Sequence, residues 1–285
     1  MRAVTRAAGL RWRDGRPVLA WEGGRASPLP YGREIGFRAA GERRCAGARG
    51  HPCPLAAVVA GRSTGGRCAE CTRLDRMTSV AADAVPDDPR VFRVYLAWFG
   101  PGLVKVGITA QERGDARLLE QGAVAFTWLG RGPLMAARRT EDVLGSALGV
   151  PDRIPYAVKR AARAGLPGPA ERAAEVMALY RRAAEVPGWG ETLERVEPRV
   201  ADHAEVFGLA GVDGVDGVVR ELVADGEVHG TVAAAAGPDV HLVAPDGRRI
   251  VLDTRLLTGW DLVSGGEGTT VPVVRIPKGA QGGLF

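Results

Sequence analysis

The sequence contains no asparagine and very few lysines. Lys105, Lys159 and Lys278 are the only lysines, so arginine supplies nearly all of the 38 basic residues. There is no stretch of about 18 apolar residues, which excludes a membrane-spanning helix of ordinary length. From Met1 to Trp12 the chain carries arginines but no apolar block, so we predict no secretory leader. We therefore expect a cytoplasmic protein with no membrane partner.

The composition is that of a globular protein with an uneven charge distribution. Of the 285 residues, 46% are hydrophobic and 25% are charged, which is enough apolar material for two or three modules. Residues 1–80 contain 15 arginines against 6 acidic residues, whereas residues 200–285 contain 6 basic residues against 12 acidic ones. The N-terminal third is therefore expected to face a polyanion, and the C-terminal third to repel one.

All four cysteines lie in one short window of the sequence, at Cys45, Cys53, Cys68 and Cys71. The last two are separated by two residues, a spacing that lets a tight turn present two thiolates to one tetrahedral ion. The first two can complete a four-sulfur shell, and His51 could replace one of the sulfurs as a ligand. The same four residues could instead form two disulfides or remain unrelated thiols, and disulfides suit a cytosolic chain poorly. We predict a structural Zn²⁺ site.

The chain reads as an α+β protein. A hairpin is predicted over 9–24, around the turn Asp14-Gly15, and two strands separated by Gly100-Pro101-Gly102 open a second module at Val91. Helical patterns follow over 113–121, 134–148 and 169–182. Short strands are expected near the C-terminus, over 218–223, 228–234, 239–244, 249–254 and 259–263.

These elements predict three modules and a tail. We expect an N-terminal β-hairpin and zinc module over 1–80 and a small central α/β domain with a helical extension over 91–185. A small β module follows over 215–275, and residues 276–285 form a flexible tail. The tryptophans Trp12, Trp21, Trp98 and Trp128 are expected to pack in the core rather than to stack on bases.

The central module carries a set of residues with a recognisable order. Val94-Tyr95-Leu96 lies in the first strand and Lys105-Val106-Gly107 in the second. Arg117 follows in a helix, and Glu141 lies in a later helix. Over residues 91–160 this pattern resembles the GIY-YIG nuclease superfamily, and within it an uncharacterised branch that has a cysteine-rich segment and a KVGIT…EQGA core.

The resemblance implies a divalent-metal-dependent, structure-selective endonuclease that acts on DNA in repair or replication. In that interpretation Tyr95 holds or deprotonates water, Arg117 binds phosphate oxygens, and Glu141 holds Mg²⁺ or Mn²⁺. Gly107 allows close approach of the backbone, and Lys105 acts as a point charge or a base. Further contacts to nucleic acid are expected from three arginines, Arg113, Arg138 and Arg139.

Three departures from the family pattern leave the function open between a nuclease and two further classes of protein. Lys105 replaces the second tyrosine, Gln121 stands where many members have His or Tyr, and the chain has no asparagine. The second class is a non-catalytic, zinc-containing nucleic-acid-binding module, and the third is an adaptor that only docks proteins. Taken singly, Tyr95 could instead only pack in the core, and Arg117 could belong to a solvated helix face. We favour the nuclease.

The last five residues form a separate motif. Gln281, Leu284 and Phe285 are arranged in the order Gln-x-x-Leu-Phe at the end of a glycine-rich segment. This resembles the pentapeptide with which bacterial DNA polymerases and repair proteins hold the sliding clamp, where a glutamine forms hydrogen bonds and two apolar anchors fill a pocket. The segment could also be a chain end without a role. We expect the sliding clamp to be a partner.

Overall fold

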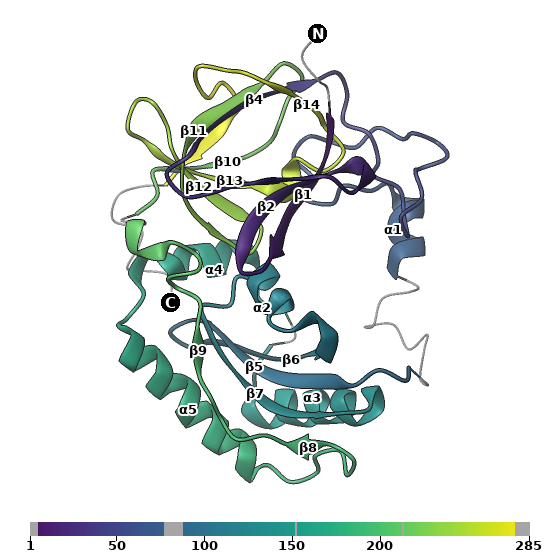
Figure 1. Ribbon diagram of the computed structural model, residues 1–285, viewed down its shortest axis with the longest axis vertical. Coiled ribbons are helices and arrows are strands. Elements are labelled where there is room, and N and C mark those ends of the chain that lie inside the picture. Colours follow the sequence, from purple (N-terminus) through teal and green to yellow (C-terminus); the bar gives the residue numbers. More distant parts are fainter. Residues whose placement is uncertain (1–4, 77–87, 152, 213, 277–285) are drawn as a thin grey trace. The chain divides into compact units, whose positions relative to one another are not determined.

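The computed structural model describes residues 5–76, 88–151, 153–212 and 214–276. It divides into two compact units, of which unit 1 combines Met1–Ala84 with Gly208–Phe285, and unit 2 is Val85–Phe207 (Figure 1). Both helices and strands are present, which confirms the predicted α+β class. None of the helices in the described part of the chain has the length and apolar character needed to cross a lipid bilayer.

Unit 1 is built on a ten-stranded sheet with the order β15-β10-β13-β12-β11-β4-β14-β1-β2-β3. Its strands come from both ends of the chain: β1 (Thr5–Arg13), β2 (Arg16–Trp21), β3 (Ala26–Pro28), β4 (Glu34–Ala40), β10 (Gly217–Val219), β11 (Glu227–Ala236), β12 (Asp239–Val243), β13 (Arg249–Asp253), β14 (Asp261–Ser264) and β15 (Val273–Arg275). Helix α1 (Ala69–Arg76) begins directly after Cys68 and carries Cys71.

The expected division into an N-terminal and a C-terminal module is corrected by this sheet. Strand β4 lies between β11 and β14, with Phe37 opposite Val228 in one ladder and Ala39 opposite Leu262 in the other. Few-stranded sheets are marginal in water, and here each end of the chain supplies strands that complete the other's sheet. Residues 1–80 and 215–275 therefore share one fold.

The first hairpin forms as predicted. Asp14 and Gly15 both have positive φ, at 49° and 70°, as a two-residue turn of the primed type requires. Among the four tryptophans expected in the core, Trp12 and Trp98 are buried, whereas Trp21 and Trp128 are only half-buried.

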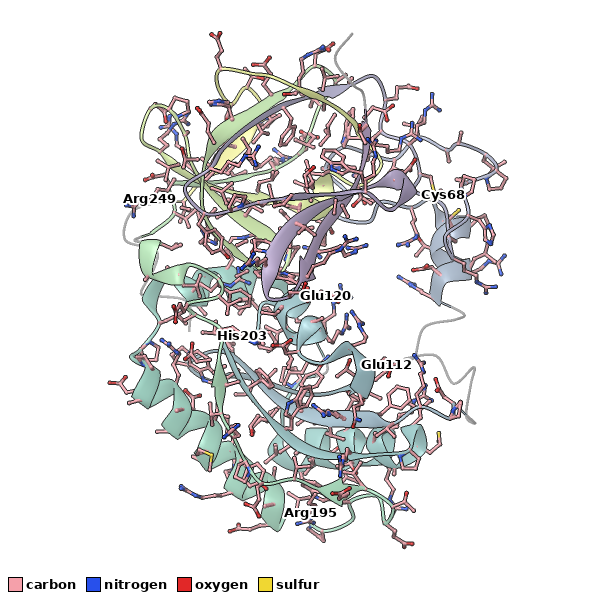
Figure 2. The ribbon with its side chains drawn as sticks, in the orientation of Figure 1. Cys68, Glu112, Glu120, Arg195, His203 and Arg249 are labelled. Atoms are coloured by element: carbon pink, nitrogen blue, oxygen red, sulfur yellow. The ribbon has the colours of Figure 1, made fainter. Side chains whose placement is uncertain are left out.

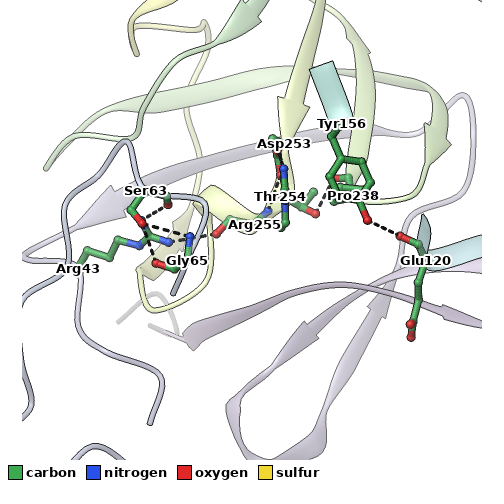
Figure 3. A network of polar contacts seen from close by, with 9 residues as sticks. All are labelled: Arg43, Ser63, Gly65, Glu120, Tyr156, Pro238, Asp253, Thr254 and Arg255. Atoms are coloured by element: carbon green, nitrogen blue, oxygen red, sulfur yellow. Dashed lines mark hydrogen bonds and ion pairs between the residues drawn. The ribbon is translucent and has the colours of Figure 1, made fainter. Parts of the chain in front are cut away.

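Arg43 ties the cysteine segment to the C-terminal part of unit 1. Its side chain is 1% exposed and donates to four carbonyl oxygens, those of Ala60, Ser63, Arg255 and Thr258, at 2.6–3.0 Å. Figure 3 shows Arg43 with Ser63 and Arg255. Burial lowers the pKa of Arg43 to about 10, which still leaves the guanidinium charged at neutral pH. Because each carbonyl is satisfied by the same side chain, Arg43 fixes the loops that lead to the cysteines.

Unit 2 is built on a smaller antiparallel sheet with helices on both sides. The strands are β5 (Phe92–Gly100), β6 (Leu103–Ala110), β7 (Ala125–Gly132), β8 (Glu194–Arg195) and β9 (Ala201–Asp202), in the order β6-β5-β7-β8 with β9 also paired to β7. The helices are α2 (Ala116–Gln121), α3 (Leu134–Leu148), α4 (Tyr156–Ala162) and α5 (Pro169–Glu185). In Figure 1, α2 and α3 lie on opposite sides of this sheet.

The core of unit 2 determines which face of the sheet carries the candidate site. Tyr95, Ala97 and Phe99 alternate along β5 and pack against Leu118 of α2 and Ile154. Helix α3 has the predicted bounds, and α2 begins at Ala116, later than predicted, after a 3₁₀ turn. The unit extends beyond residue 185, the predicted end of the central domain, because β8 and β9 add to its sheet.

Candidate functional site

The four cysteines come together in unit 1. Their sulfur atoms all lie within 4.8 Å of one another, and the Sγ atoms of Cys53 and Cys68 are 3.9 Å apart (Cys68 is labelled in Figure 2). A tetrahedral Zn²⁺ with bonds of about 2.3 Å holds its sulfur ligands roughly 3.8 Å apart, so the cluster needs little adjustment. All four are free thiols, so the interpretation as two disulfides is wrong.

The backbone around the cluster is shaped to support thiolate ligands. The amides of Gly47 and Cys68 donate to the Sγ atom of Cys45 at 3.4 and 3.2 Å. Gly47 has a φ of +73°, and a Cβ there would lie 1.9 Å from the carbonyl oxygen of His51, so only glycine fits. His51 itself is exposed and is not a member of the cluster.

The thiols of the cluster differ in acidity. The backbone amides of Ala57 and Leu55 lower the pKa of Cys53 to about 7, whereas burial raises the pKa of Cys71 to about 12. A bound cation stabilises every thiolate and offsets the cost of burying it. The cluster could therefore hold a metal ion such as zinc, and four protein ligands would leave such an ion no open coordination position.

In unit 2, Tyr95 and Gly107 lie opposite each other in the β5–β6 ladder. A Cβ built on Gly107 would come within 2.3 Å of the Tyr95 hydroxyl and 2.4 Å of its ring carbon Cζ. The ring of Tyr95 therefore crosses β6 directly over Gly107, and any side chain at that position would displace it. The two sequence-predicted residues form one structural pair.

Three more side chains act on the Tyr95 hydroxyl. The Gln121 amide donates to it at 2.8 Å, and the charges of Arg117 and Glu141 both act on its ionisation. Tyr95 is 1% exposed, and this burial raises its pKa; Gln121 and Arg117 oppose the rise, and Glu141 adds to it. Four residues singled out in the sequence, Tyr95, Gly107, Arg117 and Glu141, thus lie in one neighbourhood.

Glu120 links two of the predicted basic residues. Its carboxylate lies 2.7 Å from an Nη atom of Arg113 and 3.9 Å from one of Arg117 (Glu120 is labelled in Figure 2). The shorter pair holds Arg113 against α2, whereas Arg117 is exposed and its pair with Glu120 is longer. Arg117 is consequently the member of this group that can turn toward a phosphate.

Of the other predicted residues, Lys105 and Arg138 lie on faces that lead to the Tyr95 cluster, and Arg139 does not. Lys105 lies two residues before Gly107 on the same face of β6, opposite Ala97. Arg138 precedes Glu141 by three residues, so the two share a face of α3. Arg139 donates to the carbonyl oxygen of Gly188 at 3.4 Å, which directs it away from that face. Arg139 is therefore separated from the candidate site.

Sequence reasoning missed the side chains that hold α2 in place. Lys159 is 4% exposed, donates to the carbonyl oxygen of Gln121 at 3.1 Å, and lies 3.6 Å from the centroid of the Phe99 ring. The Tyr156 hydroxyl donates to the carbonyl oxygen of Glu120 at 3.2 Å (Figure 3). A cation at a helix C-terminus is favourable. Lys159 is one of three lysines among 38 basic residues, and this rarity is the feature of the sequence that could have singled it out.

A histidine contacts the other end of α2. His203 is buried, with its Nδ1 atom 3.0 Å from the carbonyl oxygen of Ala123 and its Nε2 atom 3.5 Å from Asp115, which precedes α2 (Figure 2). Both ends of the helix that carries Arg117 and Gln121 are thus fixed by side chains from elsewhere in unit 2. The tail residues Gln281, Leu284 and Phe285 lie outside the described residues.

The structure defines an α+β protein in which a four-cysteine cluster and a tyrosine-centred polar cluster belong to separate units. The model of the DUF2797 family, described as proteins of unknown function, matches residues 32–262, and the chain belongs to this family. Neither the curated proteins nor the solved structures gave a match.

Proposed function

We propose that unit 2 is a divalent-metal-dependent endonuclease that acts on DNA, related to the GIY-YIG superfamily. The observation that carries the proposal is the Tyr95 hydroxyl, which accepts a hydrogen bond from Gln121, is acted on by the charges of Arg117 and Glu141, and lies over Gly107. A buried phenol beside a cation and a carboxylate has little value for packing alone, since each polar group costs free energy to bury. Such groups are common at sites of chemistry.

Arg117 and Glu141 are the groups that we assign to the substrate and the metal. Arg117 is exposed and can donate two parallel N–H groups to phosphate oxygens, a geometry that lysine cannot offer. A single carboxylate, completed by water and phosphate oxygens, is an ordinary Mg²⁺ site, so Glu141 fits Mg²⁺ or Mn²⁺. Such an ion supplies charge neutralisation at phosphorus and lowers the pKa of bound water.

Tyr95 has a different role, because its hydroxyl is covered. Since Gln121 donates to the phenolic oxygen, the hydroxyl proton points to another acceptor. Its raised pKa keeps that proton in place at neutral pH. We therefore assign Tyr95 a supporting role beside Arg117 and Glu141, whose charges act on its hydroxyl, rather than a direct contact with the phosphate. Lys105 and Arg138 lie on the faces of β6 and α3 that lead to this cluster and would bind the flanking phosphates.

The test is incubation of the purified full-length protein with branched, nicked and linear DNA in the presence of Mg²⁺ or Mn²⁺. We expect strand cleavage that disappears in Glu141→Gln and Arg117→Ala and is slowed less severely in Tyr95→Phe. Failure of any metal to promote cleavage of any of these substrates would leave a non-catalytic nucleic-acid-binding module. In that case Lys105→Ala and Arg117→Ala should weaken binding and flatten its salt dependence.

We also propose that the tail binds the bacterial sliding clamp. Support comes from the sequence alone, in which Gln281 is followed by the adjacent apolar residues Leu284 and Phe285. Pocket-filling by two apolar anchors accounts for binding of short peptides in the micromolar range. A clamp contact would place the proposed nuclease at sites of replication or repair.

A further inference from the structure

The sheet of unit 1 encloses a cavity of about 610 Å³. Its walls come from β2, β3, β4, β12, β13 and β14, and its floor is apolar and buried, formed by Leu19, Phe37, Val240, Leu252 and Leu262. Sites for small molecules typically have this size and this apolar character, with a few polar groups that fix the orientation of the ligand. The polar groups therefore decide what the cavity can hold.

Trp21 provides an aromatic surface in this cavity. It is half-buried, and its indole N–H donates to the Ser27 hydroxyl at 2.9 Å, which fixes the orientation of the ring. By contrast, Trp12 of the same hairpin is 6% exposed and donates to the carbonyl oxygen of Gly237 in the interior. Trp21 is thus not a core residue but a rigid aromatic wall.

Two arginines make the same cavity attractive to an anion. Arg25 and Arg33 both line it and are both exposed, and the guanidinium of Arg25 makes one long hydrogen bond, to the Thr5 hydroxyl at 3.4 Å. Within the part of the chain that the structure describes, neither has an acidic partner. Glu34, the third charged residue of the lining, lies 3.2 Å from Nε2 of His229.

We propose that this cavity binds a nucleotide unit, with the base against Trp21 in the apolar interior and the phosphate at Arg25 and Arg33. Base-stacking on an aromatic side chain combined with arginine contacts to the phosphate is the usual way in which proteins hold single-stranded nucleic acid. An aliphatic anion would use the arginines but gain little from an oriented indole. The inference uses no residue of unit 2, so it stands or falls independently of the proposed cleavage.

The test uses full-length protein carrying Glu141→Gln, without added divalent metal, so that cleavage plays no part. Binding of a fluorescein-labelled thymidine dodecamer is measured by anisotropy at several salt concentrations, with and without thymidine monophosphate as competitor. If the monophosphate displaces the dodecamer, a free nucleotide is sufficient for binding in the cavity. If the dodecamer binds and the monophosphate does not displace it, the ligand is a nucleic-acid strand. Both outcomes support the site if the variants below respond.

Three substitutions and a matched control separate the contribution of the aromatic ring to binding from that of the arginine charge. Trp21→Leu should weaken binding by about tenfold without changing the salt dependence, and Trp21→Phe should retain most of the affinity. Arg33→Ala should reduce the slope of log affinity against log salt by about 0.7. Arg16→Ala removes the same charge from the exposed end of β2, outside the cavity, and should have little effect. Circular dichroism checks that each variant is folded. The proposal would be overturned if the parent, Trp21→Leu and Arg33→Ala proteins bound the dodecamer with equal affinity. It would also be overturned if decanoate displaced the dodecamer and the nucleotide did not.

Discussion

The substitution Gly107→Ala tests the tyrosine-centred cluster through its packing. The new methyl group would lie 2.3 Å from the Tyr95 hydroxyl and 2.7 Å from ring carbon Cε2, where ordinary contacts begin near 3.4 Å. The ring must therefore move by roughly 1 Å, and overpacking of this kind costs about 1–3 kcal/mol of unfolding free energy. Because the ring carbons clash as well as the hydroxyl, Tyr95→Phe should give no relief.

A matched glycine provides the control for this prediction. Gly145 lies within α3 and a Cβ there has no neighbour within 4 Å, so Gly145→Ala should stabilise unit 2 by roughly 0.5–1 kcal/mol through helix propensity. Hydrogen exchange in peptides from β5 and β6, followed through a urea titration, reports on unit 2 separately from unit 1.

Coupling between the two positions refines the test. In a Tyr95→Val background the clash is absent, so Gly107→Ala should cost at least about 1 kcal/mol less than it does in the natural sequence. If Gly107→Ala proves as harmless as Gly145→Ala, or costs the same in both backgrounds, then the ring does not occupy the space over Gly107 and the arrangement of the cluster is wrong.

Other parts of the molecule give four further predictions. Elemental analysis of the purified protein should give about one Zn²⁺ per chain. Because metal affinity contributes to folding, Cys68→Ser or Cys71→Ser should lower both the metal content and the melting temperature. A metal-free protein with an unchanged melting temperature would contradict this prediction. Arg43→Met removes the donor of four partly buried hydrogen bonds and should destabilise unit 1 by about 3 kcal/mol or more, whereas Arg44→Met, at an exposed pair with Glu42, should change the unfolding free energy by less than about 1 kcal/mol. Equal effects in denaturant titrations would refute the role given to Arg43. Burial raises the pKa of Tyr95 in the folded state, so its contribution to stability is full below the unfolded-state pKa of about 10 and is lost as the pH rises further. Tyr95→Phe should therefore reduce the loss of stability at alkaline pH. An unchanged dependence of stability on pH would show that the pKa of Tyr95 is not raised in the folded state. A synthetic peptide covering residues 275–285 should bind the bacterial sliding clamp with roughly micromolar affinity in a titration, and replacing Leu284 and Phe285 with alanine should remove that binding; equal affinities would leave the tail without this role.

Local features of the fold could be predicted from the sequence, because they depend on neighbouring residues. Asp14-Gly15 and Gly100-Pro101-Gly102 indicate hairpins through their turn chemistry, and the apolar periodicity of 134–148 gives α3 its bounds. The cysteine cluster was also predictable, since its four members lie within one short window. In each case the signal and the structure that it specifies are close together in the chain.

Long-range features could not be predicted in the same way. Nothing near β4 indicates that it will pair with β11 and β14, whose residues Val228 and Leu262 follow their partners Phe37 and Ala39 by 191 and 223 residues. The hydrogen bond from Gln121 to Tyr95 could not be predicted for the same reason, because it depends on how α2 packs against β5. Lys159 stands out as one of three lysines, but no residue near it indicates that its side chain lies beneath α2.

The most direct test of the central claim is the single-turnover rate of DNA cleavage for two arginine variants. Arg117 lies beside Tyr95 and Glu141, whereas Arg139 is held at the carbonyl oxygen of Gly188, away from the cluster. We predict Mg²⁺- or Mn²⁺-dependent cleavage by the natural protein, its loss by a factor of at least about 100 in Arg117→Ala, and nearly unchanged cleavage in Arg139→Ala. Equal rates for the two variants, or no cleavage by the natural protein with either metal, would contradict the proposed nuclease.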